Sequence, residues 1–133
     1  MAKKDLRSII AYILSRLGCL NPFRISRIIA YAEVIYMKVR GNRLTDLIYR
    51  GFNNVFYIEG VKEAIDNECF EKVEGDPSKG IHGCIKYTCD PPVIDEILKK
   101  YLDKAIDETR GLSDRELNDL VMNNDLFRKI MLP

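Results

Sequence analysis

The sequence is poor in the residue types on which several kinds of active site depend. It contains one histidine, His82, and no tryptophan. A metal site built mainly from imidazoles is therefore excluded, and a Ser-His-Asp triad would have to use His82, which stands in a glycine-rich stretch. No uncharged run reaches the roughly 18 apolar residues that a membrane span needs. No signal peptide is visible behind the basic start, so we expect a cytoplasmic protein with no membrane partner.

What is present describes one folded unit. The chain has 133 residues, of which 47% are hydrophobic and 31% charged, with a formal net charge of +1. This apolar content is too high for wholesale disorder, and the length leaves no room for two full domains. We therefore expect a single domain over residues 1–133.

Charge is unevenly distributed between the two halves of the chain. Residues 1–66 carry 11 Lys and Arg against 6 Asp and Glu, whereas residues 67–133 carry 10 against 14. A basic half can face nucleic acid or an acidic partner protein. Alternatively, each half solvates its own surface, or the two halves attract each other.

Helical spacing of apolar residues dominates both ends of the chain. One helix is expected over 6–17, ended by Gly18, and a second from Asn21-Pro22 to Arg40, ended by Gly41. The second has the wider apolar face and should be the most buried. A long helix is expected to open at Pro91-Pro92 and to end at Gly111. Two shorter ones follow, the first with a Ser113–Glu116 capping box and the last capped by Asn124 or Asp125.

The middle of the chain predicts a β-hairpin. Residues 69–73 and 81–87 alternate apolar and polar side chains around a polar loop, 75–80. Stretch 44–58 is ambiguous, with a turn suggested by Gly51 and Asn53-Asn54, and a short helix follows over 60–66. The expected fold is therefore α+β: a mostly helical single domain with a β-hairpin inserted before a long C-terminal helix.

The four cysteines, Cys19, Cys69, Cys84 and Cys89, form no C-x2-C pair. A zinc site that adds His82 fits no well-defined spacing. Buried free thiols are the default expectation. A Cys69–Cys84 disulfide across the hairpin is the alternative, unusual in the cytosol unless the organism is a hyperthermophile.

No constellation of residues predicts catalysis. Glu33, Glu59 and Glu63 have no second acid at a recognisable spacing, and loop 75–80 lacks the residue order of a phosphate-binding loop. We therefore expect no catalytic residues, no metal and no cofactor, and hence no enzyme.

Two sets of residues predict binding. A helix–helix–hairpin order suggests a winged helix that binds DNA, with Arg24, Arg27, Arg43 and Lys79 on phosphates. The apolar character of the arginine-bearing helix and the acids near the hairpin tip weigh against it. The second set is an aromatic cluster, formed by Tyr49, Phe52, Phe56 and Tyr57. These residues either bind a partner or close over the core.

Three segments together resemble the Panacea (SocA-like) antitoxin domain. Residues 24–32, RISRIIAYA, followed by 40–46, RGNRLTD, are similar to the family's basic and aliphatic "KLQKLLYYA" helix and its "G-x-P-L" turn. Tyr49-Arg50-Gly51-Phe52 through Val55 is similar to its "W-x-Y-G-P-V" segment, although the Trp and the Gly-Pro-Val are absent. Residues 112–120, LSDRELNDL, resemble its "LS-x-x-EL-x-x-L" element, which also follows a long helix.

The resemblance covers roughly residues 6–131 and implies a non-enzymatic protein that binds and neutralises a toxin. It implies that the surface around residues 49–57 contributes to partner binding. Our leading hypothesis is thus a cytoplasmic interaction domain with a toxin-like protein partner of unknown identity. The alternative is a winged-helix DNA-binding regulator.

Overall fold

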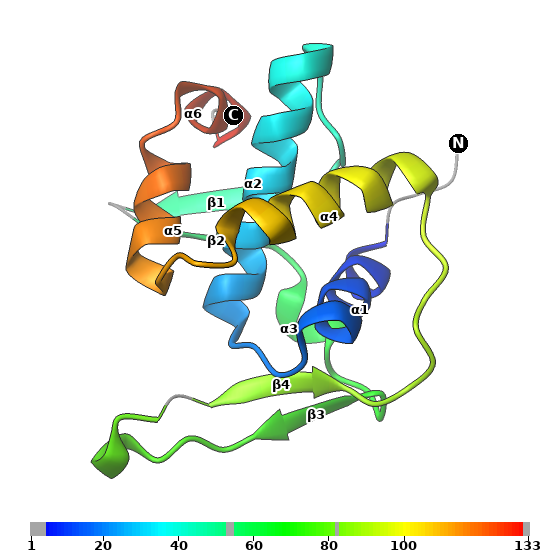
Figure 1. The fold of residues 1–133 in the computed structure, drawn as a ribbon, viewed down its shortest axis with the longest axis vertical. Helices are drawn as coiled ribbons and strands as arrows, with labels where there is room; N and C mark the ends of the chain where they lie inside the picture. The colour runs from blue at the N-terminus through cyan, green and yellow to red at the C-terminus, as the bar shows by residue number, and fades with distance from the viewer. Residues whose placement is uncertain (1–4, 53–54, 82, 132–133) are drawn as a thin grey trace.

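The computed structural model describes residues 5–52, 55–81 and 83–131 (Figure 1). In chain order its elements are α1 (Leu6–Leu17), α2 (Pro22–Arg40), β1 (Tyr49–Phe52), β2 (Val55–Ile58), α3 (Val61–Ala64), β3 (Phe70–Val73), the 3-10 turn η1 (Pro77–Lys79), β4 (Cys84–Tyr87), α4 (Glu96–Thr109), α5 (Asp114–Met122) and α6 (Asp125–Met131). The predicted class, α+β and mostly helical with a hairpin before a long helix, is confirmed.

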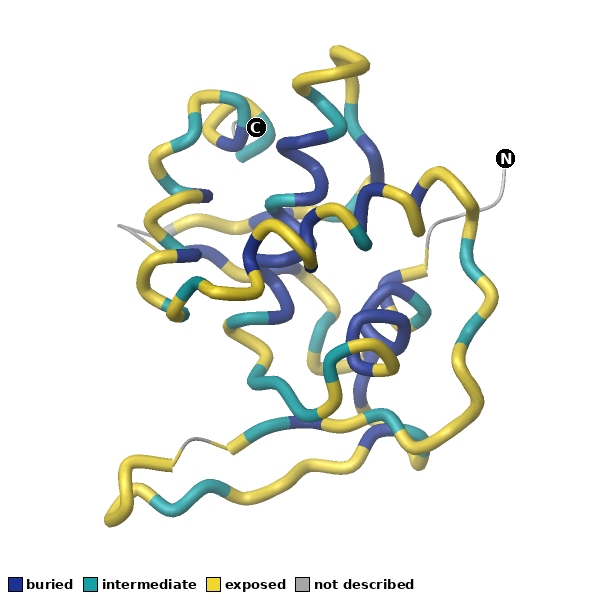
Figure 2. Tube along the Cα trace, viewed as in Figure 1, coloured by how far each residue is buried: buried dark blue, intermediate teal, exposed yellow. Residues whose placement is uncertain are grey.

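Helix α2 runs through the centre of the molecule and packs against α4, α5, α6 and β2 (Figures 1 and 2). Its predicted ends are confirmed. The Asn21 side chain accepts a hydrogen bond from the Arg24 backbone N–H at 2.7 Å, and Gly41 closes the helix in the left-handed conformation, with φ 77°. Because α2 is covered on most sides, it buries even polar residues such as Ser26, Arg27 and Glu33.

Strands β1 and β2 form an antiparallel hairpin in the stretch whose periodicity was ambiguous. Tyr49 pairs with Ile58 and Phe52 with Val55. The predicted turn at Asn53-Asn54 lies outside the described residues. Gly51 lies within β1 and not in a turn, beside the end of the Met131 side chain on α6. The glycine therefore marks a close approach between strand and helix, which the sequence could not distinguish from a turn.

Strands β3 and β4 form the predicted hairpin, with Phe70 opposite Tyr87 and Val73 opposite Cys84. Two strands alone would be marginal. Leu20, between α1 and α2, adds a third pairing: its N–H donates to the Ile85 carbonyl at 3.0 Å, and the Ile85 N–H returns a bond of 2.7 Å. The hairpin is thus attached at the α1–α2 connection, and its far end extends into solvent (Figure 2).

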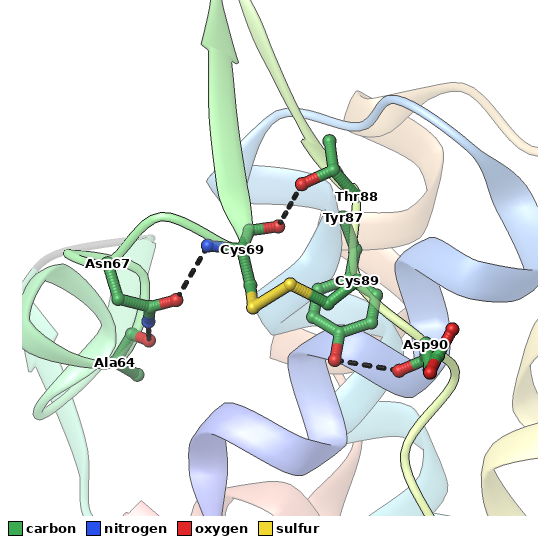
Figure 3. Close-up of a disulfide and its surroundings, with 7 residues drawn as sticks. All are labelled: Ala64, Asn67, Cys69, Tyr87, Thr88, Cys89 and Asp90. Carbon is green, nitrogen blue, oxygen red and sulfur yellow. Dashed lines mark hydrogen bonds between the residues drawn. A yellow bond between two sulfur atoms is a disulfide. The ribbon is translucent and has the colours of Figure 1, made fainter.

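Two disulfides hold this second hairpin, and both cysteine predictions were wrong. Cys19 pairs with Cys84 and Cys69 with Cys89, so no cysteine in the described chain is a free thiol. Cys69 and Cys84 cannot bridge each other because the strand register places them at opposite ends of the ladder. Cys69 instead lies beside the end of β4, where its carbonyl accepts the Thr88 N–H at 2.8 Å. The same carbonyl accepts the Thr88 hydroxyl at 3.2 Å (Figure 3).

The C-terminal helices follow the predicted pattern with two corrections. Helix α4 begins at Glu96, capped by Asp95, and not at Pro91-Pro92, so Val93 stays 99% exposed. The buried face of this helix therefore begins at Leu98. In α5 the Ser113–Glu116 capping box is present, and the helix buries Leu117 and Val121, whereas Leu120, which its apolar spacing also predicts to be buried, is 40% exposed.

Candidate functional site

The basic and acidic halves of the chain bind each other in the folded molecule. Arg16 on α1 pairs with Asp103 on α4 at 2.8 Å, and Arg24 on α2 pairs with Asp114 on α5 at 2.9 Å. Tyr12 also donates to Asp103. The charge asymmetry of the sequence is therefore used at least partly inside the fold, as the mutual-attraction interpretation expected.

Two of the predicted phosphate-binding arginines have carboxylate partners. Besides its contact with Asp114, Arg24 donates to the Thr109 carbonyl at 3.0 Å, which fixes the turn between α4 and α5. Arg43 forms a two-pronged contact with Glu33, Nε to Oε1 at 3.2 Å and Nη2 to Oε2 at 2.6 Å. Both guanidinium groups therefore have structural roles in the folded chain.

Glu33 is the centre of a buried hydrogen-bond network in the middle of α2, with its side chain 0% exposed. In addition to Arg43, it accepts bonds from the Leu44 and Thr45 backbone N–H groups, both at 3.0 Å. The Thr45 and Tyr49 hydroxyls donate to its other oxygen, at 2.6 and 3.1 Å. This network explains how a carboxylate is tolerated in the core, and it anchors the segment that leads into β1.

Arg27 differs from the other two arginines. Its residue is only 2% exposed, and its guanidinium carbon lies 3.7 Å from the Phe23 ring centroid and 4.0 Å from that of Phe56. Nε donates to the Asn118 side chain at 3.0 Å and Nη1 to the Ser26 hydroxyl at 2.9 Å. Burial lowers the pKa of Arg27 to about 10, an effect that the charge of Asp114 opposes. Nη2 is buried and, among the described residues, has no hydrogen-bond partner.

The predicted aromatic cluster is divided between core and surface. Tyr49 and Phe56 are buried, and both rings contact Phe127 of α6, with centroids 5.4 and 4.6 Å apart. Tyr57, next in the strand, is 60% exposed. The side chain of Phe52 lies outside the described part. Tyr49 and Phe56 were thus candidates for partner contact that the fold places in the core, because they share the face of the β1–β2 hairpin that packs on α2 and α6.

A groove of about 1150 Å³ opens beside this strand. Its lining comes from the start of α2, from β2 and α3, and from the inner part of the β3–β4 hairpin; it includes Phe23, Arg27, Tyr57, Val73 and Ile85. Phe23 and Val73 are also partly exposed. The sequence placed Arg27 and Tyr57 in separate candidate sites. No local pattern could join them, because only the packing of β2 against α2 brings them to the same groove.

Lys79, the fourth predicted phosphate contact, lies in η1 at the far end of the hairpin. The guanidinium groups of Arg24, Arg27 and Arg43 therefore contact acidic or aromatic side chains of the helical part of the fold. Lys79 lies on the loop of the β3–β4 hairpin, away from them. The four do not form one basic surface.

Other sites receive no support from the geometry. Within residues 5–52, 55–81 and 83–131, no group of three potential metal-ligating side chains comes together. His82 lies outside that part of the chain. None of the helices described is both long and apolar enough to cross a bilayer.

Comparison with known proteins returned no relative. No protein-family model, no curated protein and no solved structure matches this chain. The resemblance to the Panacea antitoxins therefore stays a prediction.

Proposed function

We propose that this protein is a non-enzymatic interaction domain that binds a partner polypeptide in the groove beside β2. As in the antitoxin family that it resembles, binding would neutralise a toxin-like partner by covering its active surface. The observation that carries the proposal is the exposed apolar lining of the groove, with Phe23 36% and Tyr57 60% accessible. Apolar side chains gathered in a hollow on a soluble domain are typical of binding sites.

The charges that line the groove favour a protein over a nucleic acid as the occupant. Glu59, Glu63 and Glu74 stand among its lining residues beside Lys62 and Lys72. Three carboxylates would repel a phosphate backbone, whereas mixed charges are suited to the polar rim of a protein interface.

The test is a capture experiment with three forms of the tagged chain: wild type, Tyr57→Lys, and Val93→Lys. Val93 is a matched control, because it is 99% exposed and is not part of the groove lining. We expect wild type and Val93→Lys to recover the same stoichiometric protein from native lysate treated with nuclease. Tyr57→Lys should recover at least about tenfold less, as expected when a charge enters an interface hot spot. Circular dichroism checks that all three forms fold.

Equal recovery by Tyr57→Lys and wild type would show that the groove is not the binding surface. Recovery of DNA, with all protein lost after nuclease treatment, would instead favour the winged-helix alternative. Neutralisation is tested by producing the captured protein in cells, alone and together with each form. Growth should be restored by wild type and by Val93→Lys, and not by Tyr57→Lys.

We retain the cytoplasm as the proposed location. Disulfides there are characteristic of hyperthermophiles, whereas elsewhere they indicate an oxidising compartment. Alkylation of free thiols in freshly lysed native cells, followed by fractionation, tests both points. The expected result is a cytoplasmic protein with all four cysteines oxidised.

A further inference from the structure

The groove contains a cation, Arg27, that makes no direct salt bridge with a described acidic side chain. Arg24 and Arg43 each form an ion pair, but no described acidic side chain forms one with Arg27, and its Nη2 makes no hydrogen bond within the described chain. Asp114 offsets the burial of this charge only in part, because the pKa of Arg27 is still lowered to about 10, and a buried charge without a direct partner is costly. The aromatic rings of Phe23 and Phe56 offset part of this cost through cation–π contacts. They leave one buried donor available for an incoming acceptor.

The same groove also contains the free edge of a β-sheet. The Glu59 N–H donates to the Ile48 carbonyl at 2.9 Å, so this pair is a hydrogen-bonded one. In an antiparallel pair, hydrogen-bonded and non-hydrogen-bonded residue pairs alternate along the strands. The main-chain N–H and C=O groups of Tyr57 therefore also point toward β1, and those of Phe56 and Ile58 point away from it. No main-chain bond within the described residues uses the groups of Phe56 and Ile58 on that side.

The fold leaves this edge open toward the groove. Strand β2 lies between β1 and the β3–β4 hairpin (Figure 1), and residues of both β2 and the hairpin line the groove. Tyr57 projects from the exposed face of β2, whereas Phe56 and Ile58 point into the core. An unpaired edge of this kind is a template for one more strand.

We infer that the partner inserts an extended polypeptide segment that pairs with β2, and that one carboxylate on this segment binds Arg27 Nη2. This inference rests on the proposed function and names the chemistry of the partner at the same groove. An unpaired strand edge is complemented by a polypeptide backbone, and an unpaired guanidinium donor by a carboxylate.

The lining restricts how acidic the segment can be. Three acids, Glu59, Glu63 and Glu74, balance the three cations Arg27, Lys62 and Lys72, so the lining has no excess positive charge to attract a run of acids. The segment therefore carries a single acid among apolar residues that contact Phe23, Val73 and Tyr57. Since β2 has four residues, a segment of about four or five residues spans it. Because Phe23 stacks on the Arg27 guanidinium and is partly exposed, its displacement would admit the carboxylate to the buried Nη2.

The probe is a display library of random octapeptides selected on the wild-type full chain, with binders to Tyr57→Lys removed. We expect the selected peptides to share one Asp or Glu flanked by aromatic or β-branched residues. On wild type, replacing that acid by its amide should weaken binding at least about tenfold, the loss of one charge-assisted bond. Selected peptides without an acid, or amide analogues that bind equally well, would overturn the role of Arg27.

Two further arms test the contacts separately. Arg27→Met keeps a side chain that fits the aromatic sandwich and removes a buried charge, so it should fold, and it should bind acid and amide peptides equally. N-methylation of alternate peptide residues should abolish binding in one register and be tolerated in the other, because only alternate N–H groups face β2. If N-methylation were tolerated in both registers, strand addition would be overturned. This arm uses the wild-type protein, so its result does not depend on a variant that folds.

The two proposals fail in different ways. If the partner is captured through Tyr57 but peptides show neither acid nor register dependence, the interaction domain stands and this inference falls. If Tyr57→Lys captures the partner as well as wild type does, the groove is not the site and both fall.

Discussion

The two hairpins of this molecule are held by different chemistry. The β1–β2 hairpin packs its side chains into the core through Tyr49 and Phe56, and Glu33 fixes the segment that leads into it. The β3–β4 hairpin buries little beyond Phe70 and Ile85 and is held by two disulfides and the Leu20 pairing. A strand pair with a buried face is stabilised by burial; one that projects into solvent needs covalent bonds.

The groove lies where these two hairpins face each other. The wall formed by β2 is held by core packing, and the wall formed by β3 and β4 is held by the disulfides. The width of the groove therefore depends on both hairpins. Conditions that loosen one hairpin and leave the other intact should therefore separate their contributions to binding and to stability.

Removing the disulfides should have the largest effect. Cys19–Cys84 spans 65 residues and Cys69–Cys89 spans 20. Loop-closure entropy then gives about 4 kcal/mol for the first and about 3 kcal/mol for the second. We expect paired Cys→Ser variants to lose these amounts in denaturant unfolding. Hydrogen exchange should rise more in β3–β4 than in β1–β2, and an equal rise in both hairpins would contradict the comparison.

The Glu33 network should rank next. Glu33→Gln places an amide among the donors of Arg43, Thr45 and Tyr49, so a buried pair is broken. We expect a loss of about 4 kcal/mol, with exchange rising first in β1–β2. Glu59→Gln is the matched control in the same hairpin: its pair with Arg50 is largely exposed, and the loss should stay below about 1 kcal/mol. Similar losses for the two variants would refute the buried network as the anchor.

Neighbouring aromatics in β2 should give opposite results. Phe56→Ala removes a ring that contacts Phe127 and Arg27, and should cost about 3 kcal/mol of stability. Tyr57→Ala should change stability by no more than about 0.5 kcal/mol and weaken partner capture. Thermal unfolding and capture are measured on both. A stable Phe56→Ala variant would show that this hairpin is not held by burial.

The smallest expected effect concerns alkaline pH. Burial, with the nearby charge of Glu33, raises the pKa of Tyr49 well above 10, so the folded state prefers the neutral phenol. Its contribution is complete below the unfolded value near 10 and is lost as pH rises beyond it. Between about pH 9 and about pH 11, stability should fall less steeply in Tyr49→Phe than in wild type. Burial and Asp103 raise the pKa of Tyr12 to about 12, so Tyr12 contributes to the loss of stability with pH in both forms. If stability fell equally steeply with pH in both forms, Tyr49 would be excluded as a contributor.

Local signals sufficed for most elements. The ends of α1 and α2, the capping box of α5 and the β3–β4 hairpin depend on residues close together in sequence, and each was predicted near its observed bounds. The first hairpin was left ambiguous because glycine is typical of turns, whereas Gly51 lies inside β1, beside the side chain of Met131 on α6. The prediction of element boundaries fails where a contact with a distant residue, and not the local sequence, determines the conformation.

The candidate site could be predicted only in part. Arg27 and Tyr57 stood in two separate lists, one for DNA and one for a partner protein. No pattern indicated that Arg24 and Arg43 would each form a direct ion pair and Arg27 none, because this depends on which distant elements pack together. The cysteine pairing failed for the same reason, since Cys19 reaches Cys84 across the fold.

By itself the sequence determined a single, mostly helical α+β domain and most of its helix ends, because caps, turns and apolar spacing act within a few residues. Tertiary structure alone decided which arginines are neutralised, which aromatics are buried, which cysteines pair and which strand edge stays open. These outcomes depend on which distant side chains meet, and a buried charge or an unpaired strand edge acquires its consequence only when packing excludes water around it.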